Sequence, residues 1–228
     1  MLGVVSAMRI EIWTDVICPW CGIGEHRLQE ALGRFEHASD VQVVHRSFQL
    51  DERAPPGTES VRSMLKTKKG MSEAQVEAII GRVEQIAAED GLSPYIVADN
   101  RVGNTSLAHE LAAWAAEQGR DADIWARLYR AYFGEAASIF EVEGLVELAK
   151  DVGLDGDAAR AALTSRAYAA KVATDGREAR ALGASGVPFI LIDRRYGIKG
   201  AQPTEAILEV LNEAWLASAP VEKGAAAG

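Results

Sequence analysis

The sequence predicts an α/β fold in which a sheet-forming region is split by a large, all-helical insertion. Three observations support this prediction: a strand–helix–strand unit near the start of the chain, a long central block of helical patterns, and a helix–strand–strand–helix unit at the end. We expect residues 8–54 and 167–217 to form one α/β domain, residues 55–166 to form an inserted helical domain, and residues 1–7 and 218–228 to be flexible termini.

The first unit is marked by changes in hydrophobic periodicity. Residues 8–14 (MRIEIWT) alternate apolar and polar side chains, which is typical of a half-buried strand. Residues 22–35 place apolar or small side chains at helical spacing, and residues 41–48 (VQVVHRSF) are rich in the β-branched residues that favour strands. A strand, a helix and a second strand in this order normally form a parallel pair with a right-handed crossover.

The central block begins after the Pro-Pro-Gly break at residues 55–57. Ser72 and Gln75 have the spacing of a capping box, so a helix is expected to start between them. Asn104 is placed to cap the next helix, which we expect to end before Gly119. Further helices are predicted over residues 121–133, 141–152, 157–165 and 168–182.

The end of the chain returns to β structure. Residues 188–193 (PFILID) and 196–199 are predicted to be short strands joined by a tight turn. Pro203 suits the first turn of a final helix that reaches Leu216, because proline lacks the N–H that would be unpaired there. The order of elements is therefore βαβ, a helical insertion, and αββα.

Composition and charge restrict the class of partner. Of 228 residues, 48% are hydrophobic and 25% are charged, which is a globular composition. The formal net charge of −9 argues against nucleic acid and against an anionic membrane, because either partner needs a clustered basic face. No apolar stretch approaches the length of a membrane span, and residues 1–7 lack the charged leader of a signal peptide. We therefore expect a cytoplasmic location.

The two cysteines of the chain, Cys18 and Cys21, lie between the first strand and the following helix in the sequence Cys-Pro-Trp-Cys. A cross-link this short adds little stability, so the pair is expected to be chemical. Unpaired N–H groups and the helix dipole favour a thiolate at a helix start. We expect Cys18 to be the exposed nucleophile, Cys21 to be the less accessible resolving thiol, and Pro19 to support the first helical turn.

Two other roles are compatible with this pair. A Cys-x-x-Cys motif supplies half of a zinc site, which would need two ligands from His26, His37, His45 and His109. The pair could also be an inert buried one. His26 follows Cys21 by five residues and points to a different side of the helix, and there is no second cysteine pair. Redox chemistry is therefore favoured, and no metal is predicted.

Motifs at both ends of the chain suggest a family. Residues 15–21 (DVICPWC) follow the first strand, and residues 186–189 (GVPF) precede a strand near the end. This combination resembles the DsbA-like thioredoxin superfamily, in its cytoplasmic FrnE-type branch, over about residues 8–217. The resemblance implies a thioredoxin fold and a cis peptide bond between Val187 and Pro188 beside the cysteines. From residue order alone, Pro188 could equally begin a strand.

The same resemblance implies roles for further residues. The backbone of Val187 is expected to pair with an extended substrate, and Asn104 and Thr105 are expected to line the groove that faces Cys18. The local interpretation of Asn104 as a helix cap stays open beside this one. Trp20, between the two cysteines, is expected to be exposed and to contact an apolar part of the substrate.

The activity implied by the resemblance is thiol–disulfide exchange through a mixed disulfide with protein or small-thiol substrates. It requires no cofactor beyond the Cys18–Cys21 pair, with a low-molecular-weight thiol as co-substrate where one is used, in a monomer or homodimer. One alternative is a glutathione-dependent enzyme similar to kappa-type transferases and hydroxychromene-carboxylate isomerases, which typically carry serine where Cys18 stands. Another is a non-enzymatic, chaperone-like binding module in which the cysteines are incidental.

Overall fold

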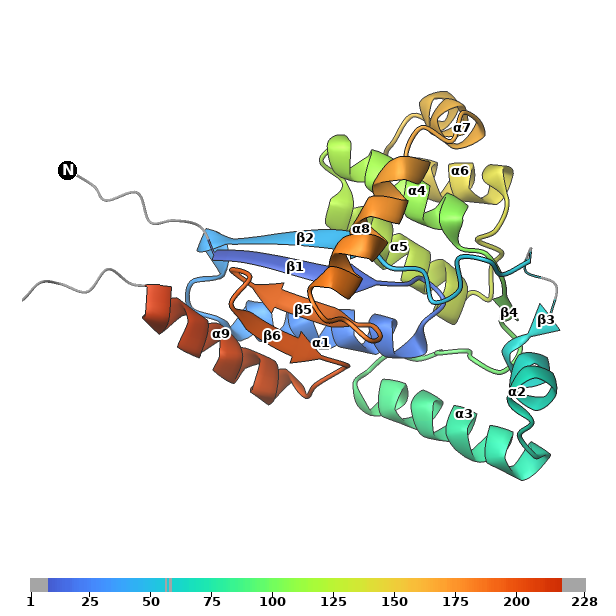
Figure 1. Ribbon diagram of the computed structural model, residues 1–228, viewed down its shortest axis with the longest axis horizontal. Helices are drawn as coiled ribbons and strands as arrows, with labels where there is room; N and C mark the ends of the chain where they lie inside the picture. Colours follow the sequence, from blue (N-terminus) through green and yellow to red (C-terminus); the bar gives the residue numbers. More distant parts are fainter. Residues whose placement is uncertain (1–7, 56, 58, 219–228) are drawn as a thin grey trace, which may run out of the picture.

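The computed structural model describes residues 8–55, 57 and 59–218, which contain a central four-stranded sheet (Figure 1). β1 and β2 are parallel in register, β5 is antiparallel to β1, and β6 is antiparallel to β5. The predicted βαβ and αββα halves therefore meet in one sheet, and the predicted thioredoxin fold is confirmed. The strands, in their order across the sheet, are β2 (Val41–Ser47), β1 (Met8–Thr14), β5 (Phe189–Ile192) and β6 (Tyr196–Lys199).

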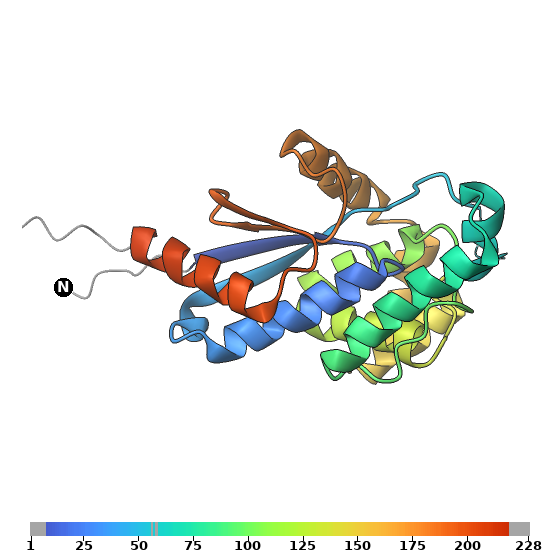
Figure 2. The same ribbon diagram turned by 90° about the horizontal axis from the view of Figure 1, so that it is seen from below.

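One face of the sheet is covered by α1 (Pro19–Arg34) and α9 (Thr204–Ser218), which run side by side (Figure 2). The alternation within β1 directs Met8, Ile10 and Ile12 into the buried cluster beneath these helices. Burial of each such side chain contributes about 1.5–3 kcal/mol, so α1 is held firmly along the sheet. Its first residue therefore lies next to the end of β1, where the cysteine motif begins.

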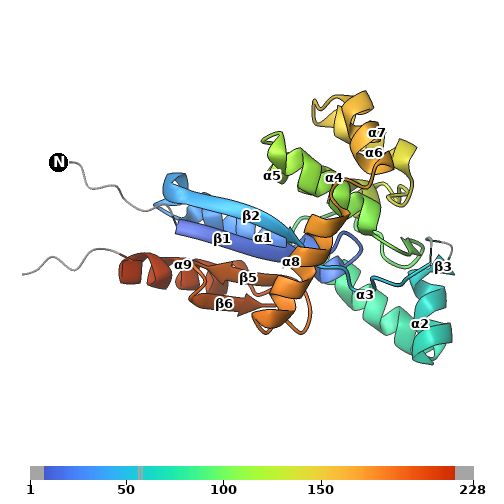
Figure 3. The same cartoon turned by 45° about the horizontal axis from the view of Figure 1, so that its top comes forward.

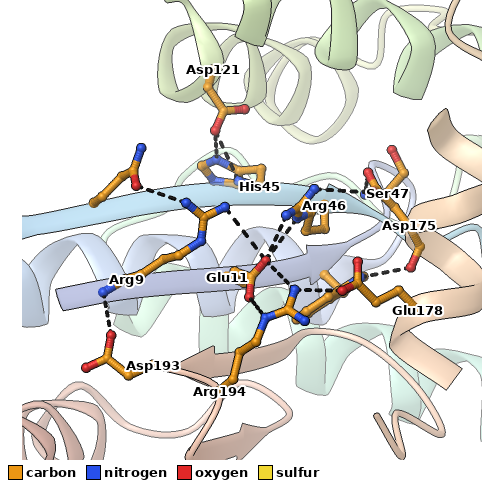
Figure 4. Close-up of polar contacts among 12 residues, drawn as sticks. Arg9, Glu11, His45, Arg46, Ser47, Asp121, Asp175, Glu178, Asp193 and Arg194 are labelled. Atoms are coloured by element: carbon orange, nitrogen blue, oxygen red, sulfur yellow. Dashed lines mark hydrogen bonds and ion pairs between the residues drawn. The ribbon is translucent and has the colours of Figure 1, made fainter. Parts of the chain in front are cut away.

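The opposite face carries α8 (Ala169–Ala181) and a network of charges (Figure 4). Glu11 of β1 is 1% exposed, and its carboxylate accepts hydrogen bonds from Arg46 at 2.8 Å and from Arg194 at 2.7 Å. Burial raises the pKa of Glu11, but the two arginines outweigh it and bring the pKa below its usual range. Arg46 also binds Asp175 of α8 at 3.3 Å, so the network ties the sheet to that helix.

The insertion forms two groups of helices at one end of the sheet (Figure 3). The first group is a pair, α2 and α3, and the second is a bundle of four helices in which α4 packs against α5, α6 and α7. The loop before α1 and the first turns of α1 contribute Val16, Cys18, Cys21 and Ile23 to the buried cluster shared with these helices. The elements are α2 (Val61–Lys69), α3 (Glu73–Glu89), α4 (Ser106–Glu117), α5 (Asp121–Tyr129), α6 (Val142–Asp151) and α7 (Gly156–Thr164).

The prediction that this insertion is all-helical is wrong in one detail. Two short strands, β3 (Glu59–Ser60) and β4 (Arg101–Val102), pair in an antiparallel manner inside it. Strands of two residues leave no alternation in the sequence, and their pairing depends on contacts between distant segments. The boundaries at residues 54/55 and 166/167 stay a prediction. Of the predicted flexible termini, residues 1–7 and 219–228 lie outside the described part, as does Pro56.

Helix boundaries agree with the prediction to within a few residues. The capping box of α3 is present, with hydrogen bonds in both directions between Ser72 and Gln75. A short 3-10 turn (Ala38–Asp40) precedes β2, and a π-helical turn (Arg130–Gly134) continues α5 over part of the residues predicted as one helix. Within the described ranges, no helix has both the length and the apolar character needed to cross a bilayer.

Candidate active site

Cys18 is the last residue of the loop that joins β1 to α1. Its backbone is extended (φ −82°, ψ 113°), it occupies the N-cap position, and Pro19 follows in the first helical turn. The Cys18 carbonyl accepts the N–H of Cys21 at 2.9 Å. Among the described residues no side chain caps this helix, and its first turn contains no acidic residue. The helix start can therefore stabilise a thiolate without opposition from a carboxylate in the first turn.

The expectation that Cys18 is exposed is wrong. Cys18 is 5% exposed and Cys21 is 0% exposed, so only the order of accessibility agrees with the prediction. The Cys18 thiol donates to the carbonyl oxygen of Val187 at 3.6 Å, and the Val187–Pro188 peptide is cis, as the resemblance implies. The loop that carries this peptide covers Cys18. Because Val187 is 169 positions away in the sequence, the residues around Cys18 could not reveal this cover.

Two glycines allow close packing against the cysteine helix. A Cβ atom at Gly24 would lie 2.8 Å from Cγ of Pro188, and a Cβ atom at Gly22 would collide with the hydroxyl of Tyr95. Because neither position has room for a side chain, Pro188 rests directly on α1. The Tyr95 hydroxyl also donates to the Pro19 carbonyl at 2.6 Å, which fixes the backbone between the two cysteines.

Cys21 is a poor thiolate former in this environment. Burial and the neighbouring Cys18 sulfur raise the pKa of Cys21 well above its usual value. Hydrogen bonds from the Thr14 hydroxyl and the Asp15 backbone N–H act in the opposite direction but are weaker. Cys21 is therefore protonated at neutral pH in the dithiol state, which fits a thiol that reacts second.

Reduced protein is expected to be alkylated by iodoacetamide first at Cys18 and much later at Cys21. Cys21 is fully buried and protonated, whereas Cys18 has slight exposure and a helix start behind it. Mass spectrometry of peptides from a labelling time course measures both rates. A Cys21→Ala variant should keep the rapid reaction, and a Cys18→Ala variant should react slowly. Equal labelling of the two thiols at neutral pH would contradict this expectation.

Asp15 joins the cysteine loop to two other parts of the molecule. Its buried carboxylate accepts the backbone N–H of Leu50 at 2.8 Å and lies 3.2 Å from Nε2 of His109. Asp15 and His109 are each 0% exposed. Asp15 therefore ties the loop before Cys18 to the segment after β2 and to α4 of the insertion.

A groove of about 550 Å³ opens beside the cysteine motif, between the loop after β2 and the helix pair α2–α3. Trp20, Leu50 and Ile79, which line it, are 37%, 51% and 47% exposed, so the predicted exposure of Trp20 is confirmed. Such a groove suits an apolar segment of a ligand. The charged side chains on its walls are Asp51, Glu59, Lys68 and Lys69.

Asn104 and Thr105 organise the start of α4. The Asn104 side-chain oxygen accepts the N–H of Ser106 at 2.9 Å, and its amide donates to the Glu52 carbonyl at 3.0 Å. Thr105 is 2% exposed. Of this segment, Gly103 lines the groove, whereas Asn104 and Thr105 are not among the described residues that line it. Thr105 rather than Asn104 occupies the N-cap position of α4, so the local interpretation of Asn104 is wrong by one residue, and Asn104 binds the first N–H of the helix from the position before the cap.

The four histidines named for the zinc alternative have other partners. His26 lies 3.8 Å from Glu30, His37 stacks on Trp215, and His45 and His109 contact carboxylates. Within the described part of the chain, no group of three or more His, Cys, Asp and Glu side chains is arranged to hold a metal ion. The arrangement around Cys18 and Cys21 is that of a dithiol.

Comparison with known proteins identifies the family. The model of the DSBA-like thioredoxin domain matches residues 9–212. This chain belongs to the DSBA-like thioredoxin family. A crystal structure of a probable DsbA oxidoreductase from Streptomyces coelicolor shares 44% sequence identity and a TM-score of 0.87, over 91% of this chain and 90% of that one. The family assignment supports oxidoreductase chemistry at the cysteine pair.

More distant structures share the fold alone. The cytosolic disulfide reductase DsbM from Pseudomonas aeruginosa, solved with GSH, is 20% identical with a TM-score of 0.57, over 91% of this chain and 96% of that one. A 2-hydroxychromene-2-carboxylate isomerase is 14% identical with a TM-score of 0.67, over 90% of this chain and 93% of that one. The DSBA-like fold therefore occurs with redox and with isomerase activities. The activity of this chain has to be inferred from its site residues and not from its fold.

Proposed function

We propose that this chain is a FrnE-type thiol–disulfide oxidoreductase that cycles Cys18 and Cys21 between a dithiol and a disulfide. The placement of the two thiols at the start of α1, beneath the Val187 carbonyl, supports this most directly. In the reducing direction, the Cys18 thiolate attacks a substrate disulfide and releases one substrate thiolate. Cys21 then loses its proton and attacks the Cys18 sulfur, which releases the second substrate thiol and leaves the protein oxidised by two electrons.

The groove is proposed as the binding site for the segment of substrate that flanks the reacting sulfur. Its exposed apolar residues begin at Trp20, next to the cysteines, and continue to Ile79 of α3. Lys68 is already paired with Glu59 on the same wall, so Lys69 is the residue that would pair with a carboxylate of a peptide or of a small thiol. In addition, the Val187 carbonyl, which now accepts the Cys18 thiol, would pair with an extended substrate.

The glutathione-dependent transferase or isomerase is the second candidate, and the similarity of its fold is the observation in its favour. A serine in place of Cys18 can activate a bound thiol but cannot form a disulfide. Cys18 with Cys21 one turn later allows reversible bridging, so the redox proposal is preferred. The proposal includes a cytoplasmic location, protein or small-thiol partners, no further cofactor, and a monomer or homodimer.

The decisive experiment is a redox titration in glutathione buffers. We expect the protein to switch reversibly between a Cys18–Cys21 disulfide and a dithiol, as a single two-electron transition. Trapping the free thiols with a large maleimide and resolving the products on a gel measures the two forms. The Cys21→Ala variant is the control, because it cannot form the internal disulfide. The proposal would be defeated if the protein did not switch reversibly between its disulfide and dithiol forms. It would also be defeated if a Cys18→Ser variant kept a glutathione-dependent transferase or isomerase activity.

A further inference from the structure

The backbone of the cysteine motif receives a hydrogen bond from a side chain that is distant in the sequence. The Tyr95 hydroxyl donates to the Pro19 carbonyl oxygen at 2.6 Å, across 76 positions of the chain. This carbonyl belongs to the Pro19–Trp20 peptide, which is the central peptide between Cys18 and Cys21. Within the described ranges, no other side chain forms a hydrogen bond with a backbone atom of these four residues. Tyr95 is therefore the side chain that fixes the orientation of the central peptide.

Tyr95 lies in the segment between α3 and β4, and the insertion holds it in place. Its ring is stacked on the ring of Phe133, with the centroids 4.5 Å apart and an angle of 9° between the planes. The next residue, Ile96, donates its backbone N–H to the Phe133 carbonyl at 2.7 Å. Phe133 is 2% exposed and belongs to the π-helical turn that follows α5. The Tyr95 hydroxyl therefore meets Pro19 from a support that is fixed by packing and by hydrogen bonding.

The hydroxyl is a constant donor in a closely packed site. Burial, followed by the charges on Cys18 and Cys21, raises the pKa of Tyr95 above its usual value, so the hydroxyl keeps its proton at neutral pH. A Cβ atom at Gly22, next to Cys21, would collide with this hydroxyl, whereas the nearest ring carbon, Cζ, would be 3.4 Å away. The lack of a side chain at Gly22 therefore leaves the space through which the hydroxyl reaches Pro19.

We propose that Tyr95 is a positioning residue that holds the central peptide in the conformation from which Cys21 reaches the Cys18 sulfur. Tyr95 has this role only if the two cysteines cycle as proposed, so the role rests on the proposed function. In the step concerned, Cys21 loses its proton, and its sulfur bonds to the Cys18 sulfur while the bond between Cys18 and the substrate breaks. The electron pair of that bond leaves on the substrate sulfur, which takes up a proton. Tyr95 acts through the backbone between the two cysteines.

The Tyr95 bond affects the two redox states unequally. In the dithiol it restrains the turn between the cysteines, whereas in the disulfide the bridge itself also restrains that turn. Loss of the bond therefore returns conformational freedom mainly to the dithiol, which makes the disulfide less stable relative to it. Cys21 is also presented to the mixed disulfide less often, so resolution slows. A hydrogen bond between neutral groups changes an equilibrium constant by about three- to tenfold.

The test compares two tyrosine-to-phenylalanine variants of the full-length protein. Tyr95→Phe keeps the ring and its stacking on Phe133 and removes only the hydroxyl. Tyr132→Phe is the matched control, because the Tyr132 hydroxyl also donates to a backbone carbonyl, that of Arg101, at 2.7 Å. In a redox titration with glutathione buffers, we expect the disulfide of Tyr95→Phe to be about three- to tenfold less stable than that of wild type. Tyr132→Phe should stay within about twofold of wild type.

The substrate dithiobis(nitrobenzoate) separates the two kinetic steps. Attack by Cys18 releases one coloured thiolate and leaves a mixed disulfide, and resolution by Cys21 releases the second. In Tyr95→Phe, the second release should slow by about three- to tenfold, while the first stays within about twofold of wild type. Gly22→Ala, which would displace the hydroxyl, should slow the second release in the same way. It should add little to Tyr95→Phe, because the two substitutions remove the same bond.

The outcomes separate the role of Tyr95 from the function on which it rests. A wild-type value of either the disulfide stability or the rate of resolution in Tyr95→Phe would overturn the positioning role. Equal slowing of both releases, a more stable disulfide, or an equal effect in Tyr132→Phe would also overturn it. If Tyr95→Phe does not fold, Gly22→Ala decides the matter by the same criteria. A wild-type protein that releases only one coloured thiolate would instead defeat the proposed function.

Discussion

Replacing Cys18 with serine is expected to abolish disulfide exchange, with a loss of more than about a thousandfold in rate. A serine hydroxyl is not ionised at neutral pH and forms no disulfide, so the first attack is lost. Replacing Cys21 with alanine should instead stop the reaction after that attack. With glutathione disulfide as substrate, intact-mass measurement should then show one glutathione attached to Cys18 in Cys21→Ala and none in Cys18→Ser.

Loss of activity in Cys18→Ser or Cys21→Ala must be distinguished from loss of structure. Both positions are buried in the cluster shared by α1 and the insertion, so each variant should be compared with wild type by thermal unfolding. A folded Cys18→Ser protein that still exchanges disulfides would remove Cys18 from the mechanism. Glutathione attached to Cys21 in the wild-type protein would reverse the roles given to the two thiols.

Local features of the fold were predictable because local physics determines them. The alternation in residues 8–14 gives the bounds of β1, and the Ser72–Gln75 pair gives the start of α3. The helix after the cysteines begins at Pro19 rather than at residue 22, because proline is favoured in a first turn and Cys18 serves as N-cap. The motif itself was enough to place the cysteine pair at a helix start.

The surroundings of that pair were not predictable in the same way. The cover over Cys18 comes from Val187, the groove wall from Leu50 and Ile79, and the hydroxyl that bonds Thr14 from Tyr129. These segments are far apart in the sequence, and only the packing of the insertion brings them to the start of α1. Periodicity and capping signals describe one element at a time, so they carry no information about such contacts.

Helix α5 shows how the insertion takes part in the site. Its last residue, Tyr129, bonds Thr14 beside the cysteines, and its first residue, Asp121, bonds His45 of β2. Both ends of one inserted helix are therefore fastened to the sheet that carries the cysteine motif. A substitution that breaks the bond between Asp121 and His45 is therefore expected to shift the position of Tyr129, since both residues belong to one helix of nine residues.

The buried charges around His45 are expected to contribute strongly to the stability of the fold. The His45 side chain is 1% exposed, with Nε2 3.1 Å from Glu25 and Nδ1 3.1 Å from Asp121 (Figure 4 shows the second contact). Burial by itself lowers the pKa of His45, but the charge of Glu25 and the bond to Asp121 raise it to about 10. His45→Gln should therefore lower the free energy of unfolding by about 3–5 kcal/mol, because two carboxylates lose their shared cation.

The pH dependence distinguishes this charge effect from lost packing. In the folded protein the pKa of His45 is about 10, against 6.5 for an unperturbed histidine. The folded state therefore holds the proton more tightly, and its stabilisation is complete below about pH 6.5 and is lost as the pH rises towards 10. Urea unfolding across this range should show the difference between wild type and His45→Gln narrowing with increasing pH, while the His37→Gln control stays close to wild type. A difference that stays constant with pH would mean that His45 acts through its shape, and α5 would then be held by packing rather than by charge.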